Sequence, residues 1–218
     1  VIESNIVKEM ASQFKNLLEV DLGEARKEET TSITRFMEKE WAHITKSQAL
    51  DFESSPETGV SRAELAKIAQ ALYTAPEGHQ FYKKALRLIK DREKMFKDTN
   101  RIDWGMAELL AYGSLLIEGK EVRMTGQDVE RGTFSHRHAI LRDVESEERV
   151  NLLNHIGEGQ GKFEIYNSLL SEYAVLGFDY GYAMASPDVL TIWEAQFGDF
   201  SNGAQILIDQ YLAAAEDK

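Results

Sequence analysis

One glutamate of this chain stands where its carboxylate could take up and release a proton. Glu172 follows Ser171 at the start of an apolar run that is rich in small residues. We expect this run to form a helix whose first turn is buried by close packing, and a buried carboxyl group tends to share a proton with a partner. The alternative is a helix-capping glutamate. The small residues recur three or four apart, at Ala174, Gly177, Gly181 and Ala185.

Two phenylalanines form the second candidate. Phe197 and Phe200 flank Gly198, shortly after the apolar residues 189–194, which we predict to be a buried strand; Gln196 precedes the pair. Aromatic faces at the end of a strand can stack on a planar ring, and such stacking contributes about 0.5–1.5 kcal/mol beyond burial. The alternative is that both rings only fill the core.

The third candidate is the polar, glycine-containing segment of residues 125–138. Gln127 lies near its start, and His136 and His138 alternate near its end, so the two histidines would share one side of an extended chain. Taken alone, these residue types suggest anion binding or a weak metal site. A solvated loop is the alternative.

The composition is that of an ordinary globular chain. Its 218 residues, 43% hydrophobic and 28% charged, fit one large domain or one domain with an appendage. A net charge of −12 argues against a nucleic-acid-binding surface. No apolar run approaches the roughly 20 residues of a membrane span. The absence of cysteine excludes disulfides and thiol catalysis, and the chain begins at Val1 rather than Met, so we expect a processed or excised piece.

The first hundred residues are predicted to be mostly helical. Apolar residues recur there at helical spacing, and Ser61 with Glu64 forms a capping box. Nothing in this part carries a catalytic signature. The predicted elements are helices over 4–18, 24–46, 61–75 and 80–97, with a loop or linker over 47–60.

From residue 101 onward, strands alternate with helices, which predicts a parallel sheet. The predicted fold class is α/β: a parallel sheet flanked by helices, with a mostly helical N-terminal region. Loops at the carboxyl ends of such strands are the usual ligand site. We place the domains at 1–60, 61–100 and 101–218. The predicted elements are helices over 103–118, 171–185 and 203–215, strands over 121–125, 163–166 and 189–194, and a loop over 131–142.

Several motifs together resemble one enzyme family. They are Gly126-Gln127-Asp128, the run from Arg131 to His138, Asn167-Ser168, Ser171-Glu172, and the run from Trp193 to Gln205. In this combination the segment from Ile102 to Lys218 is similar to the pyrimidine-binding domain of the thiamine-diphosphate-dependent decarboxylating component of 2-oxoglutarate dehydrogenase. The resemblance is weaker over 61–97 and poor over 1–60.

The resemblance implies a cofactor, thiamine diphosphate, and a role for each candidate. A glutamate that hydrogen-bonds a ring nitrogen of the aminopyrimidine favours its imino tautomer. The implied reaction decarboxylates 2-oxoglutarate and passes the succinyl group to a lipoyl group of the succinyltransferase component. The implied enzyme is a homodimer of the bacterial cytoplasm or the mitochondrial matrix. The implied site residues are Glu172, His136 and His138 for catalysis, and Glu172, Phe197, Phe200, Gln127 and Gln196 for the cofactor.

Part of the family signature is missing. No Gly-Asp-Gly with a following Asn, the motif that holds diphosphate and magnesium, occurs in the chain, and Gly157-Glu158-Gly159 lacks the Asn. We therefore expect a fragment that holds one half of a composite site, without magnesium ligands and inactive alone. Two alternatives stay open: a catalytically dead interaction domain that kept the fold, and a small metal protein that uses His136 and His138.

Overall fold

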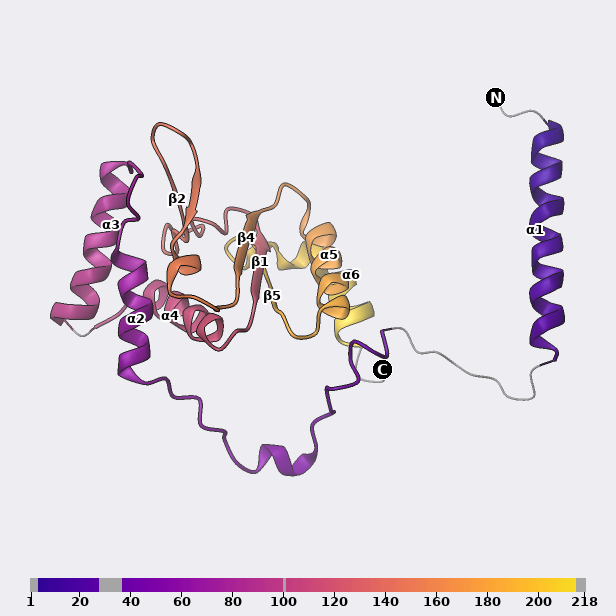
Figure 1. Ribbon diagram of the computed structural model, residues 1–218, viewed down its shortest axis with the longest axis horizontal. Helices are drawn as coiled ribbons and strands as arrows, with labels where there is room; N and C mark the ends of the chain where they lie inside the picture. Colours follow the sequence, from indigo (N-terminus) through magenta and orange to yellow (C-terminus); the bar gives the residue numbers. More distant parts are fainter. Residues whose placement is uncertain (1–3, 28–36, 100, 215–218) are drawn as a thin grey trace. The chain divides into compact units, whose positions relative to one another are not determined.

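The computed structural model describes residues 4–27, 37–99 and 101–214 (Figure 1). The chain divides into two compact units, Val1–Glu38 and Lys39–Lys218. The first contains helix α1, Ser4–Ala25, which confirms the predicted helix and extends it. Over the described ranges, no helix combines the length and apolar character that a membrane span requires.

The helix predicted over 24–46 is wrong over the described residues 26–27 and 37–46, and residues 24 and 25 are the last two of α1. Residues 37–46 form turns and irregular chain, and residues 28–36 lie outside the described ranges. The reason is tertiary: the Trp41 indole Nε1 donates to the Met184 carbonyl at 2.7 Å, and the His43 ring lies 3.1 Å from Asp188 Oδ1. A short 3₁₀ turn, Ala49–Phe52, interrupts the predicted linker.

In the described part of the second unit, the α-helices before the sheet are α2 (Arg62–Tyr73), α3 (Lys83–Lys94) and α4 (Trp104–Ile117). Capping side chains determine where α2 and α4 begin. Ser61 Oγ accepts from the Glu64 backbone N–H at 3.2 Å while the Glu64 carboxylate accepts from the Ser61 N–H, which confirms the capping box. At the start of α4, Asp103 Oδ1 accepts from the Met106 N–H at 2.8 Å.

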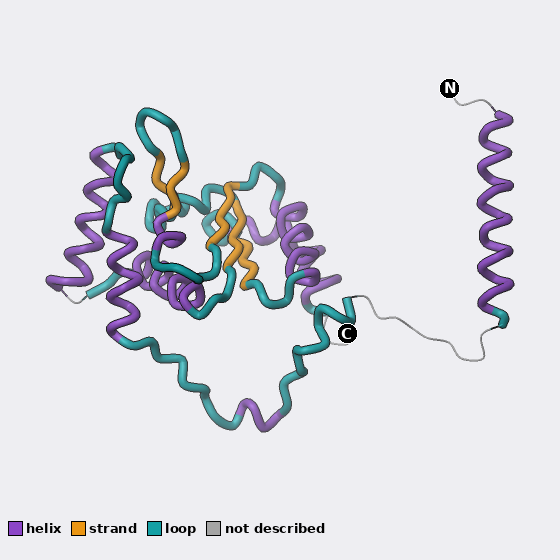
Figure 2. Tube along the Cα trace, in the orientation of Figure 1, coloured by secondary structure: helices purple, strands orange, loops and turns teal. Residues whose placement is uncertain are grey.

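The central sheet is parallel, which confirms the predicted fold class. Its strands are β1 (Val122–Gly126), β4 (Phe163–Asn167) and β5 (Leu190–Glu194), in the order β4-β1-β5 (Figure 2). Helix α5 (Glu172–Ala185) connects β4 to β5. In register, Gly126 pairs with both Asn167 and Glu194, so the three carboxyl ends coincide.

Further differences from the predicted elements occur in two later regions. The segment predicted as a loop over 131–142 ends in strand β2 (Ile140–Arg142), which pairs with β3 (Arg149–Asn151) in an antiparallel hairpin. The helix predicted over 203–215 is confirmed as helical over residues 203–212, although it is not one regular α-helix, and residue 215 lies outside the described ranges. A 3₁₀ segment, Asp199–Ala204, runs into the single turn α6 (Gln205–Leu207) and then into a π-helical turn, Ile208–Leu212.

The two faces of the sheet carry different side chains. Val122 and Met124 of β1 point into a core formed with α2 and α4, whereas Arg123 and Thr125 point toward α5, since successive strand residues alternate. Figure 1 shows α4 on one side of the sheet and α5 with α6 on the other. The α5 side holds a smaller buried cluster, Leu176, Ala204 and Leu207.

Candidate functional site

Two of the predicted site residues meet at the carboxyl edge of the sheet. Gln127 directly follows β1, and Glu172 is the first residue of α5. The Gln127 side-chain Nε2 donates to Glu172 Oε1 at 3.2 Å. Residues 45 positions apart in the sequence are thus joined at the point where ligands of parallel sheets bind.

Glu172 is half-buried, so the expectation of a buried carboxylate is wrong for this chain. The small-residue stripe on α5 packs only in part. A Cβ at Gly177 would lie 3.1 Å from Leu207 Cδ1, but a Cβ at Gly181 would meet nothing within 4 Å. One side of α5 therefore faces open space, and Gly203 is the glycine that packs on the Glu172 side chain.

The two phenylalanines do not fill the core. Phe197 is 50% exposed and Phe200 is 49% exposed, so the core-filling alternative is wrong. The Phe134 ring lies edge-on to Phe197, with ring centroids 5.5 Å apart. Gln196 is half-buried beside them. The result is a partly open aromatic surface just after β5.

His136 and His138 do not share a side. The His136 ring lies near the Phe134 ring, at 6.2 Å between centroids, while His138 Nε2 lies 2.8 Å from Ser135 Oγ. The segment is not extended, because Ser135 (φ 58°) and His138 (φ 39°) have left-handed backbone conformations. His136 therefore belongs with the aromatic surface at Phe197, and His138 belongs elsewhere.

An arginine that sequence reasoning missed holds the edge of the sheet together. Arg137 is buried and donates from Nε to Glu108 Oε1 at 2.6 Å and from Nη1 to Glu194 Oε1 at 3.0 Å. Its Nη1 also donates to the Val129 carbonyl at 2.8 Å. Burial alone would lower the pKa of Arg137, but its hydrogen bonds with Glu194 and Glu108 reverse this and raise the pKa. Two features of the sequence could have indicated this role. Arg137 stands between two histidines, and Glu194 is the acidic last residue of an apolar strand.

No group of three or more His, Asp or Glu residues within the described ranges is arranged to hold a metal ion. His136 and His138 make different contacts, as described above. The acid closest to His136 is Glu108, with 3.9 Å between His136 Nε2 and Glu108 Oε2. The alternative of a small metal protein therefore has no support in this geometry.

Comparison with known proteins decides the family. Residues 100–217 match the family model of the transketolase pyrimidine-binding domain. The chain belongs to this family. It is also 42% identical over 219 residues to the mitochondrial 2-oxoglutarate dehydrogenase of Caenorhabditis elegans, an alignment that covers 100% of the chain.

Other relatives carry related names. The mitochondrial 2-oxoglutarate dehydrogenase of Schizosaccharomyces pombe is 53% identical over 161 residues, or 74% of the chain. The 2-oxoglutarate dehydrogenase E1 component of Brucella anthropi is 39% identical over 220 residues, or 100% of the chain. The chain spans only about a fifth of these relatives, with alignments covering 21%, 16% and 22% of their lengths.

The family implies thiamine diphosphate, and the residues at the carboxyl edge fit its pyrimidine ring. Glu172 Oε1 accepts from Gln127, while its Oε2 accepts no hydrogen bond from any residue of the described ranges. The Phe197 and Phe200 rings are half exposed and leave aromatic surface for stacking. A carboxylate oxygen without a partner in the described ranges, at the same edge of the sheet as partly open aromatic rings, suits a heteroaromatic ring with a nitrogen to be hydrogen-bonded.

Proposed function

We propose that this chain supplies the pyrimidine-binding half of the site of a 2-oxoglutarate dehydrogenase decarboxylating component. The contact between Gln127 and Glu172 carries the proposal, because it orients a carboxylate at the edge where a ring would bind. The overall match to 2-oxoglutarate dehydrogenases supports it. Thiamine diphosphate supplies carbanion-stabilising chemistry when bound.

Each residue of the chain has a role in this proposal. Glu172 would exchange a proton with the ring through Oε2, the oxygen that Gln127 leaves free, and Gln127 fixes the carboxylate by donating to Oε1. Phe197 and Phe200, with Gln196 beside them, bind the ring faces. His136 lies on the same aromatic surface through Phe134, toward the mouth of the site. His138, also predicted as catalytic, faces a different groove.

The larger activity is part of the proposal. The parent enzyme would decarboxylate 2-oxoglutarate and pass the succinyl group to a lipoyl group of the succinyltransferase component. It would act in the bacterial cytoplasm or the mitochondrial matrix. We expect the 218-residue chain alone to show no turnover with thiamine diphosphate and magnesium, because it lacks the Gly-Asp-Gly motif with a following Asn. Turnover by a preparation free of host enzyme would refute this expectation.

The Glu172→Gln substitution in the full-length parent enzyme tests the site. The amide keeps the shape but loses the acid–base function, so turnover should fall on the order of 10²-fold or more while cofactor binding changes less. Glu164→Gln is the matched control, since Glu164 lies on β4 and pairs with Lys162 instead. Near-normal turnover of Glu172→Gln would reduce Glu172 to a helix-capping residue and favour the interaction-domain alternative.

The aromatic surface is tested separately by Phe197→Ala and Phe200→Ala. A ring that stacks on the cofactor should raise the apparent cofactor dissociation constant and leave the melting temperature largely unchanged, because both rings are half exposed. If both substitutions change melting equally and neither changes cofactor affinity, the rings have no binding role.

We also propose a homodimer. Several large apolar side chains are exposed, including Trp104 at 91% and Leu169 at 101%, and Phe178 on α5 is 58% exposed. Where such side chains form one contiguous patch, the patch usually marks an interface. Light scattering should give about twice the chain mass of 24.7 kDa, whereas a monomer mass across micromolar concentrations would contradict the proposal.

A further inference from the structure

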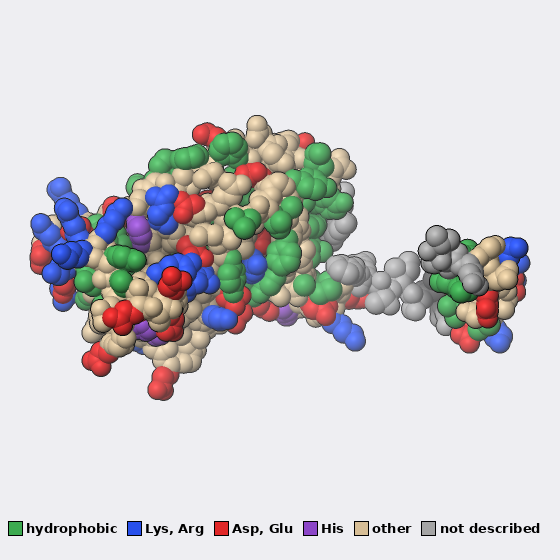
Figure 3. All heavy atoms as spheres, turned by 90° about the horizontal axis from the view of Figure 1, so that it is seen from above, with side chains coloured by type: hydrophobic (Ala, Val, Ile, Leu, Met, Phe, Trp, Pro, Cys, Tyr) green, Lys and Arg blue, Asp and Glu red, His purple; other side chains and the backbone are tan. Residues whose placement is uncertain are grey.

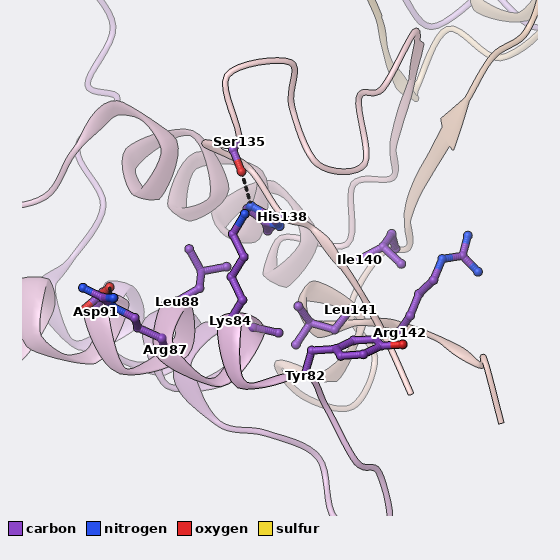
Figure 4. Close-up of a pocket in the computed structure, with 11 residues that line it drawn as sticks. Tyr82, Lys84, Arg87, Leu88, Asp91, Ser135, His138, Ile140, Leu141 and Arg142 are labelled. Atoms are coloured by element: carbon purple, nitrogen blue, oxygen red, sulfur yellow. Dashed lines mark hydrogen bonds and ion pairs between the residues drawn. The ribbon is translucent and has the colours of Figure 1, made fainter. Parts of the chain in front are cut away.

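We propose that the groove between α3 and the segment 135–142 binds a small organic anion, a carboxylate or phosphate group carried on an apolar body. The groove has a volume of about 760 Å³ and is lined from α3 by Lys84 and Leu88 and from the facing segment by Ser135, His138 and Leu141 (Figure 4). Glu172, Gln127, Phe197 and Phe200 do not line it, so the inference does not rest on the proposed cofactor site.

The polar end of the groove is already organised. Ser135 Oγ lies 2.8 Å from His138 Nε2, and Figure 4 shows the Lys84 side chain extending toward this pair. The left-handed turn that holds both side chains is fixed by its backbone, because the Arg131 carbonyl accepts from the N–H groups of Arg137 at 3.0 Å and of His138 at 2.9 Å. A hydroxyl, an imidazole and an ammonium group thus converge without rearrangement.

The charges around the groove favour an anion. Its lining includes Lys84, Arg87 and Arg142 against one carboxylate, Asp91, which pairs with Arg87 at 3.9 Å. Lys84 and Arg142 form no ion pair within residues 37–99 and 101–214. Figure 3 shows Lys and Arg side chains gathered at the end of the unit that carries α3.

A buried cation lies behind the same wall. Arg92 of α3 is 2% exposed, and its Nη2 donates to the carbonyls of Arg137 and His138. Its Nη1 is buried without a hydrogen-bond partner in the described part of the chain. Burial lowers the pKa of Arg92 to about 10, against the opposing charge of Asp103, so the guanidinium stays charged at neutral pH. The Arg92 guanidinium therefore contacts the backbone of His138, a residue that lines the groove.

The effect of these charges is visible at His138. Burial lowers its pKa, and the positive charges of Arg92, Lys84 and Arg131 lower it further, while Asp128 opposes them. The same positive charges that disfavour protonation of His138 would attract a bound anion. An anion bound between Lys84 and His138 should therefore raise the His138 pKa.

The rest of the lining selects an organic ligand. Ala85, Leu88, Ile140 and Leu141 are apolar, and Tyr82 also lines the groove. Apolar walls with a few convergent polar groups are typical of small-molecule sites, and the volume lies within their usual range of roughly 300–1,000 Å³. Inorganic phosphate has no apolar part that could contact these apolar side chains.

Calorimetric titration of the 218-residue chain tests the inference with four probes: phenyl phosphate, 4-phenylbutyrate, inorganic phosphate and 2-phenylethanol. The two aromatic anions should bind, and the uncharged alcohol and bare phosphate should bind at least about tenfold more weakly, because the site needs both a charge-assisted contact and apolar burial. Comparing the two aromatic anions shows whether phosphate or carboxylate is preferred.

Lys84→Ala should weaken binding of the better anion by about tenfold or more. The matched control is Lys90→Ala, which removes the same charge from an exposed position of α3 that does not line the groove. Both lysines are exposed, so both variants should fold, and melting curves check this. NMR titration should show the His138 pKa rising with ligand. Absence of binding, equal binding of the alcohol, or an equal loss in Lys90→Ala would overturn the inference.

Discussion

The two faces of the sheet differ in how much apolar surface they bury. The face toward α2 and α4 contains a continuous core that includes Phe163 and Ile165 of β4, each at most 2% exposed. On the α5 side of the sheet the buried apolar cluster is small, formed within the described residues by Leu176, Ala204 and Leu207. We infer that the first face supplies most of the stability and that the second face leaves surface for binding.

Polar and aromatic groups replace a core on the α5 face. Asp179 of α5 is 3% exposed and accepts from Arg123 Nη1 at 2.7 Å and from the Thr125 hydroxyl. The Arg123 guanidinium also lies 5.1 Å from the Phe178 ring and 4.7 Å from the Tyr182 ring. Burial raises the pKa of Asp179, against the hydrogen bonds from Thr125 and Arg123. Such a face specifies geometry but contributes little hydrophobic stabilisation.

The largest expected difference comes from deleting one buried side chain on each face. Phe163→Ala should lower the free energy of unfolding by about 3–5 kcal/mol, because it removes a ring that packs on Tyr112 within the main core. Leu207→Ala should cost about 2 kcal/mol, the low end for its type, since its cluster is small. Urea unfolding measures both. Equal losses would show that the faces contribute alike.

The edge shared by both faces should be nearly as sensitive. Arg137→Met should cost about 3 kcal/mol, because it leaves Glu108 and Glu194 without their partner. The control is Arg131→Met, which removes an exposed arginine paired with Asp128 and should change stability by no more than about 0.5 kcal/mol. If Arg137→Met melted like the unsubstituted chain, the cluster would not hold the edge.

Two helical glycines sharpen the comparison. A Cβ at Gly113 of α4 would overlap the Ile68 side chain, so Gly113→Ala should destabilise by about 1–3 kcal/mol. A Cβ at Gly181 of α5 meets nothing within 4 Å, so Gly181→Ala should stabilise by about 1 kcal/mol through helix propensity. Thermal unfolding of both variants should give shifts of opposite sign. Shifts of the same sign would mean that α5 is covered as tightly as α4.

The smallest expected effect is acid sensitivity at the β2–β3 hairpin. Backbone N–H groups of Ser146, Gln80 and Glu145 hold the pKa of Asp143 well below its usual range. The unfolded chain then binds the proton more readily, so this contribution is present above about pH 4, the ordinary aspartate range, and is lost as the pH falls below it. Asp143→Asn should flatten the acid limb of stability against pH. An unchanged acid limb would remove Asp143 as its source.

Local chemistry explains which elements were predictable. The capping box at Ser61 and the cap at Asp103 satisfy backbone groups within three residues, so the starts of α2 and α4 follow from the sequence. The hairpin strands β2 and β3 have three residues each, which is too short for an alternating apolar and polar pattern to predict them. The segment 37–46 has helical spacing, but contacts with the distant Met184 and Asp188 override it.

The site was predictable in part for the same reason. Glu172 and Gln127 stand at element ends, where chain order alone suggests a meeting point, and the structure brings them together. The separation of His136 from His138 depends on the left-handed conformation of His138, which could not be predicted from its residue type. The burial of Arg137 depends on carboxylates 29 positions before it and 57 positions after it in the chain.

The contact between Trp41 and Met184 sets an order of events during synthesis. The two residues are 143 positions apart, so the indole leaves the ribosome long before its acceptor exists. At about 5–20 residues per second the delay is on the order of 10 s. The central strand β1 likewise waits for β5 to be made. The contacts that this unit makes through Met184 and β5 therefore form only after those late residues have emerged.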